Sequence, residues 1–95
     1  MRPVVGSTGL EIEASFLDGQ LIAAYIHFPG NADDRSARCE CVDPGLVIDY
    51  ATSGRPLGIE VTMPRAVTLE VINGVMRRLG LRELSDRDFA PLKAA

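Results

Sequence analysis

The segment Leu57-Gly58-Ile59-Glu60-Val61-Thr62-Met63-Pro64 ends one hydrophobic pattern, and a different pattern follows it. Up to Met63 the apolar residues occupy alternate positions, which is the period of a strand with one buried face. From Thr68 onward the apolar residues fall within one arc of a helical projection, and Gly80 ends this pattern. The change of period predicts an α+β fold, in which an antiparallel sheet precedes the helices.

Further segments with the composition of strands lie before Leu57. Leu10–Phe16 alternates strictly between apolar and polar residues, and Asp18-Gly19 after it favours a tight hairpin turn. The others are the apolar run Leu21–Phe28, the alternating Ser36–Val42, and Leu46–Tyr50 after the turn at Pro44-Gly45. Short strands with tight connections predict an antiparallel meander of about five strands.

The residues after Thr68 predict one amphipathic helix and one short C-terminal helix. The apolar arc of the first contains Leu69, Val71, Ile72, Val75, Met76 and Leu79, and the polar arc contains Glu70, Asn73, Gly74, Arg77 and Arg78. Thr68 is its candidate N-cap, and Ser85–Asp88 resembles a capping box for a second helix anchored by Phe89 and Leu92. We expect a single domain over residues 1–95, with the sheet over about 10–63 and the helices over about 68–92.

Length and composition limit the class of protein. The chain has 95 residues, of which 46% are hydrophobic, and a formal net charge of -3. A chain of this length builds one core, which excludes a two-domain enzyme with an interdomain cleft. The acidic balance argues against nucleic-acid binding, because Arg77 and Arg78 form the one basic pair in the sequence. No segment approaches the about 18 apolar residues of a membrane span or resembles a secretory signal, so we expect a cytoplasmic protein.

Two motifs at the centre of the chain resemble a known family. Gly45–Tyr50 reads G-x-x-x-D-Y and Gly54–Val61 reads G-x-x-x-G-I-E-V, with the strand Ala23–Phe28 before them. Roughly residues 20–63 thus resemble the bacterial family catalogued as domain of unknown function 2283. Ile22 departs from the pattern, because members usually carry an Asp there, and the strand Leu10–Phe16 and the C-terminal extension go beyond the family core.

The resemblance implies a small antiparallel sheet with helical support and no established activity. Some relatives look like partners in two-gene, toxin-antitoxin-like arrangements. What the resemblance implies for this chain is therefore a regulatory module with a protein partner.

His27 is the sole histidine of the sequence. With Cys39 and Cys41 it offers soft ligands for a metal, but zinc sites separate their cysteines by two to four residues rather than by one. A disulfide between residues two apart on a strand would be strained. We therefore predict a strand histidine, two buried cysteines, and no metal, cofactor or nucleophilic catalytic residue.

Asp49 and Glu60 lie on adjacent predicted strands and could approach as paired carboxylates, which is the arrangement used in acid catalysis. The simpler interpretation is that Asp49 accepts backbone hydrogen bonds in the turn after it and that Glu60 occupies a solvent face. Aromatic residues on strands can also anchor an interface. We retain Tyr25, His27, Asp49 and Glu60 as candidate ligand or interface residues.

The run Leu21–Ile26 is apolar at odd and even positions, which predicts that both of its faces are buried. One helix of about 12 residues spans roughly 18 Å and cannot cover a whole face. A symmetric partner would cover the remainder, so we expect a homodimer. In the alternative, the N-terminal strand and the segment Phe89–Leu92 cover that face within one chain.

These observations favour a non-enzymatic protein-interaction or regulatory module, acting as a homodimer or as the small partner of another protein. The alternative is a small ligand-binding protein or enzyme with a site at a dimer interface around His27, Asp49 and Glu60. The two hypotheses differ in whether these side chains contact a ligand.

Overall fold

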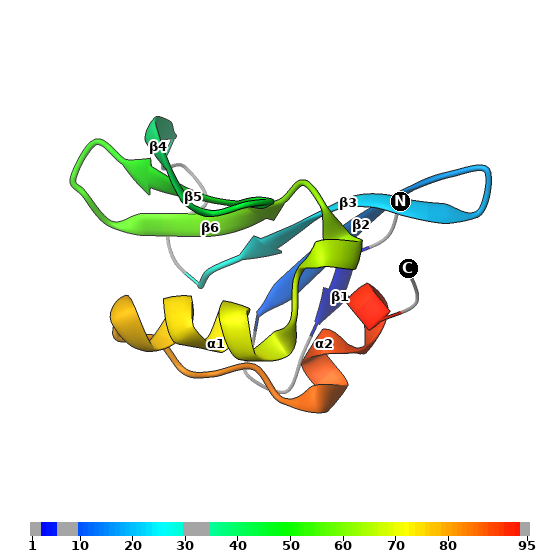
Figure 1. Cartoon of the computed structure of the whole chain (residues 1–95). Helices are drawn as coiled ribbons and strands as arrows, with labels where there is room; N and C mark the ends of the chain where they lie inside the picture. Colours follow the sequence, from blue (N-terminus) through cyan, green and yellow to red (C-terminus); the bar gives the residue numbers. More distant parts are fainter. Residues whose placement is uncertain (1–2, 6–9, 30–34, 94–95) are drawn as a thin grey trace.

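The computed structural model describes residues 3–5, 10–29 and 35–93 of the chain. In these ranges the chain forms a six-stranded antiparallel sheet with the α-helices against one of its faces (Figure 1). The strands are β1 (Pro3–Val5), β2 (Glu11–Leu17), β3 (Gln20–His27), β4 (Ser36–Asp43), β5 (Leu46–Ala51) and β6 (Pro56–Val61). After them come the 3-10 helix η1 (Pro64–Ala66) and the helices α1 (Leu69–Arg78) and α2 (Asp86–Lys93). The α+β fold predicted from the change of period is confirmed.

The sheet consists of two three-stranded meanders, β1-β2-β3 and β6-β5-β4, which join where β3 pairs with β6. The continuous meander predicted from the sequence is therefore wrong in one connection, because β4 lies at the far edge and does not pair with β3. β6 buries Ile59 and Val61, whereas the residues of β4 from Ser36 to Cys41 are exposed. Pairing β3 with β6 keeps apolar strands at the centre of the sheet and places the most polar strand at its edge.

A β-bulge interrupts the hairpin formed by β2 and β3. Ser15 pairs with Ala23, but the next residue, Phe16, pairs with Leu21. Ile22 is left out of the pairing, so that Leu21 is buried and Ile22 is exposed. The prediction that the apolar run of β3 is buried on both faces is therefore wrong for the chain by itself. Phe16, which the alternating pattern places in the core, is also exposed, because it lies near the end of β2, where the hairpin extends past the helices (Figure 1).

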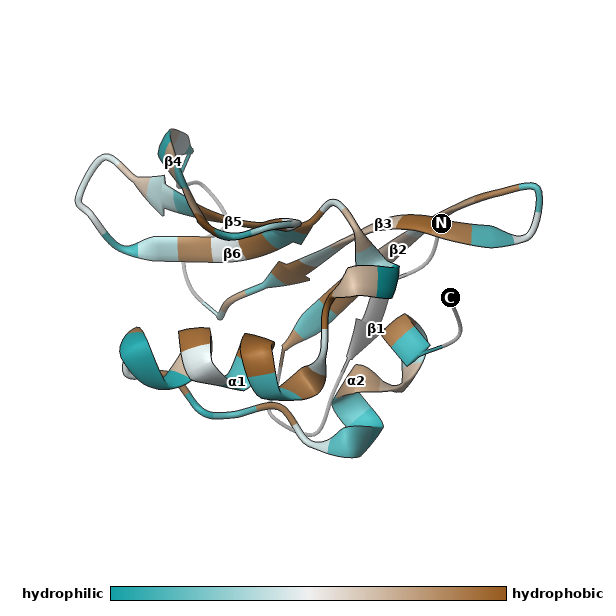
Figure 2. Cartoon of the chain, viewed as in Figure 1, coloured by the Kyte–Doolittle hydropathy of each residue, from teal (hydrophilic) through white to brown (hydrophobic). Residues whose placement is uncertain are grey.

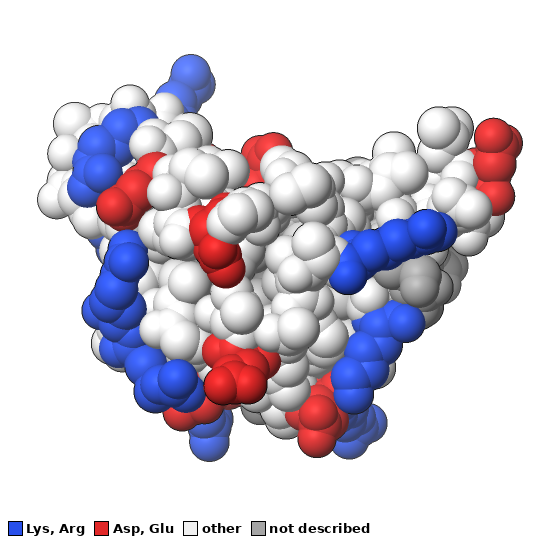
Figure 3. Space-filling view, viewed as in Figure 1, with Lys and Arg blue, Asp and Glu red and all other residues white. Residues whose placement is uncertain are grey.

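Both α-helices lie on the same face of the sheet. In Figure 1, α1 lies beneath β5 and β6 and α2 lies beneath β1 and β2. The helices carry hydrophilic as well as hydrophobic residues (Figure 2), and charged side chains lie on the surface at the helical side of the molecule (Figure 3). The C-terminal helix thus completes the cover of the core face, and none of the described helices covers the opposite, open face of the sheet. None of the described helices has the length and apolarity that crossing a membrane requires.

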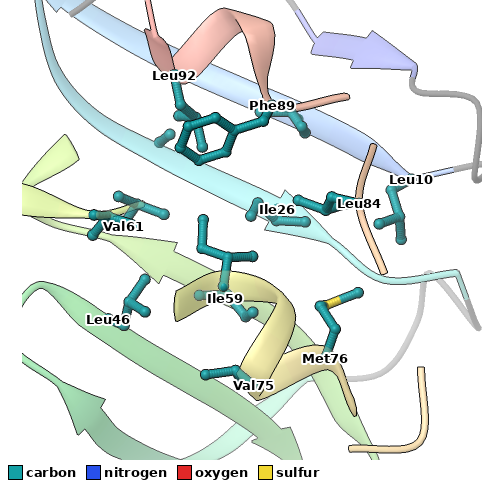
Figure 4. Close-up of a cluster of buried hydrophobic side chains, with 14 of the residues drawn as sticks. Leu10, Ile26, Leu46, Ile59, Val61, Val75, Met76, Leu84, Phe89 and Leu92 are labelled. Carbon is teal, nitrogen blue, oxygen red and sulfur yellow. The ribbon is translucent and has the colours of Figure 1, made fainter. Parts of the chain in front are cut away.

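The core fills the space between the sheet and the helices. Its largest fully buried side chains are Ile12, Ile26, Leu46, Ile48, Ile59, Val61, Ile72 and Met76. Figure 4 shows Val75 of α1 and Phe89 and Leu92 of α2 directed at the strands. Burial of each side chain of this kind contributes roughly 1.5–3 kcal/mol. Phe89 and Leu92 are therefore the apolar anchors predicted for the second helix.

Local hydrogen bonds begin the helices where the sequence predicts. The Thr68 hydroxyl accepts a hydrogen bond from the Val71 amide at 3.2 Å, which makes Thr68 the N-cap of α1. The Ser85 amide donates to the Asp88 carboxylate at 3.0 Å, and the Asp88 amide donates to the Ser85 hydroxyl at 3.1 Å. This reciprocal pair is a capping box in which Asp replaces the usual Glu. The turn at Asp18-Gly19 also forms, with φ angles of 51° and 79°.

Asn73 lies in the core, although the helical projection places it on the polar arc of α1. Its side-chain amide donates to the Leu84 carbonyl at 3.0 Å, and its side-chain oxygen accepts from the Leu84 amide at 2.7 Å. The side chain of Asn73 thus hydrogen-bonds both backbone groups of Leu84 and ties the segment before α2 to α1. A buried polar side chain is stable here because each of its polar groups is paired with the backbone.

We predict that Asn73→Ala lowers the free energy of unfolding by about 2 kcal/mol, because it leaves the N–H and C=O groups of Leu84 without their partners. Urea denaturation measures this change. Glu70→Ala, at an exposed position of the same helix, is the matched control and should change the free energy by less than about 0.5 kcal/mol. Equal effects of the two substitutions would contradict the structural role of Asn73.

Candidate functional site

The face of the sheet opposite the helices brings the sequence-predicted candidate residues together. Tyr25 pairs with Glu60, and Gly58 pairs with His27 on one side and with Asp49 on the other. Directly paired residues point to the same face of a sheet, so the four candidates share this face. The same register adds Glu13, opposite Tyr25, and Cys39, opposite Asp49. We call Glu13, Tyr25, His27, Cys39, Asp49 and Glu60 the open-face cluster.

Gly58 allows the centre of this cluster to form. A Cβ atom at Gly58 would lie 2.5 Å from Cε1 and 2.8 Å from Cζ of Tyr25, and 2.5 Å from the Ile26 carbonyl oxygen. The ring of Tyr25 therefore lies across β6 in the space that a side chain would fill. From there its hydroxyl donates a hydrogen bond to Oδ2 of Asp49, at 2.8 Å, on the strand beyond. The glycine is required for close approach rather than for a positive φ.

Asp49 holds two donors at once. Its Oδ2 accepts from Tyr25, and its Oδ1 accepts from the Cys39 thiol, with an Sγ to Oδ1 distance of 2.9 Å. The predicted role of Asp49 as an acceptor for the following turn is thus corrected, because its side chain points from β5 to the open face. Asp49 also does not stand opposite Glu60, since Asp49 pairs with Gly58 and Glu60 pairs with Val47. Glu60 is exposed, as predicted.

His27 is a strand histidine, as predicted, and the structure adds its partner. Nε2 of His27 contacts Oε1 of Glu13, and both side chains are about one-third exposed, at 39% and 34%. The ring of His27 also contacts the ring of Tyr25, with centroids 4.5 Å apart. The sequence shows Glu13 on the polar side of its strand, but the bulge at Ile22 is what aligns it with Tyr25 and His27.

Cys39 and Cys41 are exposed free thiols, so the prediction of two buried cysteines is wrong. They lie on β4, the edge strand, where no other strand of the described residues covers them. Across the described ranges, no group of three or more His, Cys, Asp or Glu side chains is arranged to hold a metal ion.

The electrostatics of the cluster keep its acidic donors protonated. Loss of solvent around the hydroxyl raises the pKa of Tyr25, and the hydrogen bond to Asp49 and the charges of Asp49 and Glu60 raise it further. The hydrogen bond to Asp49 is also the main cause that raises the pKa of the Cys39 thiol. Because a thiol reacts as its thiolate, this arrangement opposes nucleophilic chemistry at Cys39. The Tyr25 hydroxyl and the Cys39 thiol instead remain protonated and donate hydrogen bonds to the Asp49 carboxylate.

Comparisons of the chain with protein-family models, with curated proteins and with solved structures found no match. The functional interpretation therefore depends on the residues of this chain and their geometry.

We predict opposite effects for alanine at two glycines. Gly58→Ala should lower the free energy of unfolding by about 2 kcal/mol, because the added methyl group overlaps the Tyr25 ring and the Ile26 carbonyl. Gly74→Ala, on α1, should raise it by roughly 1 kcal/mol, because the nearest atom to the new Cβ is the end of Arg77, 3.8 Å away. Chemical denaturation of both variants tests the assignment, and stabilisation by Gly58→Ala would refute it.

We also predict that Asp49→Asn lowers the pKa of Tyr25, because it removes a negative charge beside the phenolate. Ultraviolet titration in a Tyr50→Phe background isolates Tyr25, since the chain has 2 tyrosines. The folded protein holds this proton more tightly than the unfolded chain, whose tyrosine has a pKa of 10.0. Stability should therefore fall as pH rises above about 10, and less steeply in Asp49→Asn. An unchanged titration would contradict the hydrogen bond.

Proposed function

We propose that this chain is a non-enzymatic protein-interaction or regulatory module of the cytoplasm, which acts as a homodimer or as the small partner of another protein. The observation that carries the proposal is a group of large apolar side chains exposed to solvent: Phe16 (55%), Leu17 (62%), Ile22 (47%) and Met63 (46%). Contiguous apolar side chains on a small protein mark contact surfaces.

These side chains come from one end of the sheet. Phe16 and Leu17 end β2, and Ile22 is the bulged residue of β3. Since Ala24 pairs with Val61, Ile22 and Met63 each lie two residues beyond that pair, at the same end. We call Phe16, Leu17, Ile22 and Met63 the apolar end. Figure 2 shows the hairpin of β2 and β3 extending past the helices at this end, with hydrophobic residues along it.

The chemistry of the open-face cluster supports binding in preference to catalysis. Tyr25 and Cys39 both have raised pKa values and stay protonated at neutral pH, so neither is an activated nucleophile. The resemblance of residues 20–63 to a family with toxin-antitoxin-like relatives supports the same class of function.

A second candidate function is a ligand site on the open face, completed by a dimer partner. The observation that favours it is that His27, Asp49 and Glu60 lie on one uncovered face with Tyr25 between them. Asp49→Asn with Glu60→Gln would abolish binding of a small molecule at such a site. The same pair of substitutions leaves the apolar end unchanged, so it separates the two functions.

Native mass spectrometry of the protein isolated from its own host tests the main proposal. We expect a stoichiometric partner protein held at the apolar end of the wild type, and at least tenfold weaker retention of that partner by Phe16→Ser with Leu17→Ser, because each side chain loses roughly 1.5–3 kcal/mol of apolar burial. Arg82→Ser with Ala90→Ser, both exposed on the helical side, is the control and should retain the partner. A wild type without partner or second copy, or equal retention of the partner protein by all variants, would overturn the proposal.

A further inference from the structure

β4 is an edge strand of the described sheet. It pairs with β5 on one side, and no described strand pairs with its other side (Figure 1). Its residues from Ser36 to Cys41 are all exposed. An edge of this kind presents backbone N–H and C=O groups that a further strand can use. What the edge can pair with depends on the order of its side chains.

The charges of β4 are complementary to those of a reversed copy of β4. Arg38 precedes Cys39 and Glu40 follows it. If two copies pair antiparallel about a two-fold axis at Cys39, Arg38 of each copy stands opposite Glu40 of the other. Opposite charges directly across a strand pair stabilise it, by roughly 0.2–1 kcal/mol each.

From this exposed edge and the order of its charges we propose that β4 pairs antiparallel with β4 of a second copy about a two-fold axis at Cys39. This pairing makes the sheet continuous across a homodimer. The inference rests on the proposed function and deepens its homodimer form by naming the surface and the register.

Neighbouring registers are disfavoured by like charges. Residues paired across the axis must share a face, so the axis can move from Cys39 to an adjacent residue but not to a point between two residues. An axis at Glu40 places the two Glu40 side chains opposite each other, and an axis at Arg38 does the same for arginine. Like charges in directly opposed positions destabilise a strand pair. The axis at Cys39 avoids both arrangements.

Contacts within one chain fix the positions of the Arg38 and Glu40 side chains. The Arg38 guanidinium lies 4.0 Å from the centroid of the Tyr50 ring, and the Tyr50 hydroxyl donates to Glu40 at 3.0 Å. Arg78 of α1 reaches Glu40 as well, at 3.5 Å. Arg38 and Glu40 are thus positioned side by side before a second copy arrives, which reduces the entropy cost of pairing. Figure 3 shows basic and acidic side chains next to each other at the end of the molecule that carries β4.

The irregularities of β4 limit the assembly to a closed pair. The pairing with β5 shifts between Ser36 and Arg38 and again between Cys41 and Asp43, so the regular segment is Arg38–Cys41. Bulges at both ends keep the exposed edge short. A two-fold pair uses this edge in both copies, so the same contact cannot continue into a fibre.

Cysteine cross-linking tests the register. In the proposed dimer the two Cys39 residues face each other, at the Cα separation of about 4.5–5.5 Å typical of opposed residues, which a disulfide can span. The two Cys41 residues lie four positions apart along the strands, or about 13 Å. Diamide oxidises two thiols to a disulfide and takes up the two electrons and two protons that they release. We expect Cys41→Ser to form a covalent dimer under diamide and Cys39→Ser to form none.

The same oxidation in denaturant is the control, since the two unfolded variants should react equally. Cross-linking of folded Cys39→Ser at the rate of Cys41→Ser, or no covalent dimer from either variant, would overturn the register. Wild type that cross-links while neither variant does would place the axis at Glu40, because Cys39 then faces Cys41 of the second copy.

Charge exchange provides an independent measurement. Arg38→Glu and Glu40→Arg each place like charges across the axis and should weaken dimerisation by about tenfold in sedimentation equilibrium, because the pair occurs twice. The double variant Arg38→Glu with Glu40→Arg should recover the wild-type affinity. If the double variant does not recover this affinity, although denaturation curves show that all variants are folded, the pairing is refuted. Because the apolar end is intact in these variants, a partner held there in the absence of β4 pairing would leave the proposed function standing.

Discussion

The pairing of β3 with β6 is the contact on which the rest of the structure depends. It joins two separate meanders into one sheet and places Ile26 opposite Ile59 at the centre of the core. The same pairing sets Gly58 beneath the ring of Tyr25, so that a residue of one meander reaches Asp49 in the other. The core face and the open face are therefore consequences of one register, because side chains alternate strictly between the two faces of a strand.

The two faces of the sheet have different structural roles. The helices cover one face and bury the large aliphatic side chains that supply most of the stability. The open face keeps a hydrogen-bonded chain of side chains in which Asp49 accepts from Tyr25 and Cys39. Protein contacts are proposed at other places, at the apolar end and along β4. This separation lets the molecule present surfaces to partners without opening its core.

Most of the strands and helices could be predicted from the local sequence pattern. Alternation and turn residues located the five longer strands, and Thr68 and the Ser85–Asp88 box located the starts of the helices, because these signals act within a few residues. The candidates Tyr25, His27, Asp49 and Glu60 do share one face. The hydrogen bond from Cys39 to Asp49 and the contact of Glu13 with His27 were missed, because they join residues on different strands and depend on strand order and on a bulge.

The sequence by itself determined the kinds of element, their order and their caps, since hydrophobic period and capping are properties of neighbouring residues. Only the tertiary structure decided which strands are central and which lie at an edge. That choice exposes Cys39 and Cys41, although their alternation is typical of a half-buried strand. It also buries Asn73, which finds its partners on Leu84 after the chain has left α1. The physical reason is that burial depends on what covers a residue, and the covering segments come from distant parts of the chain.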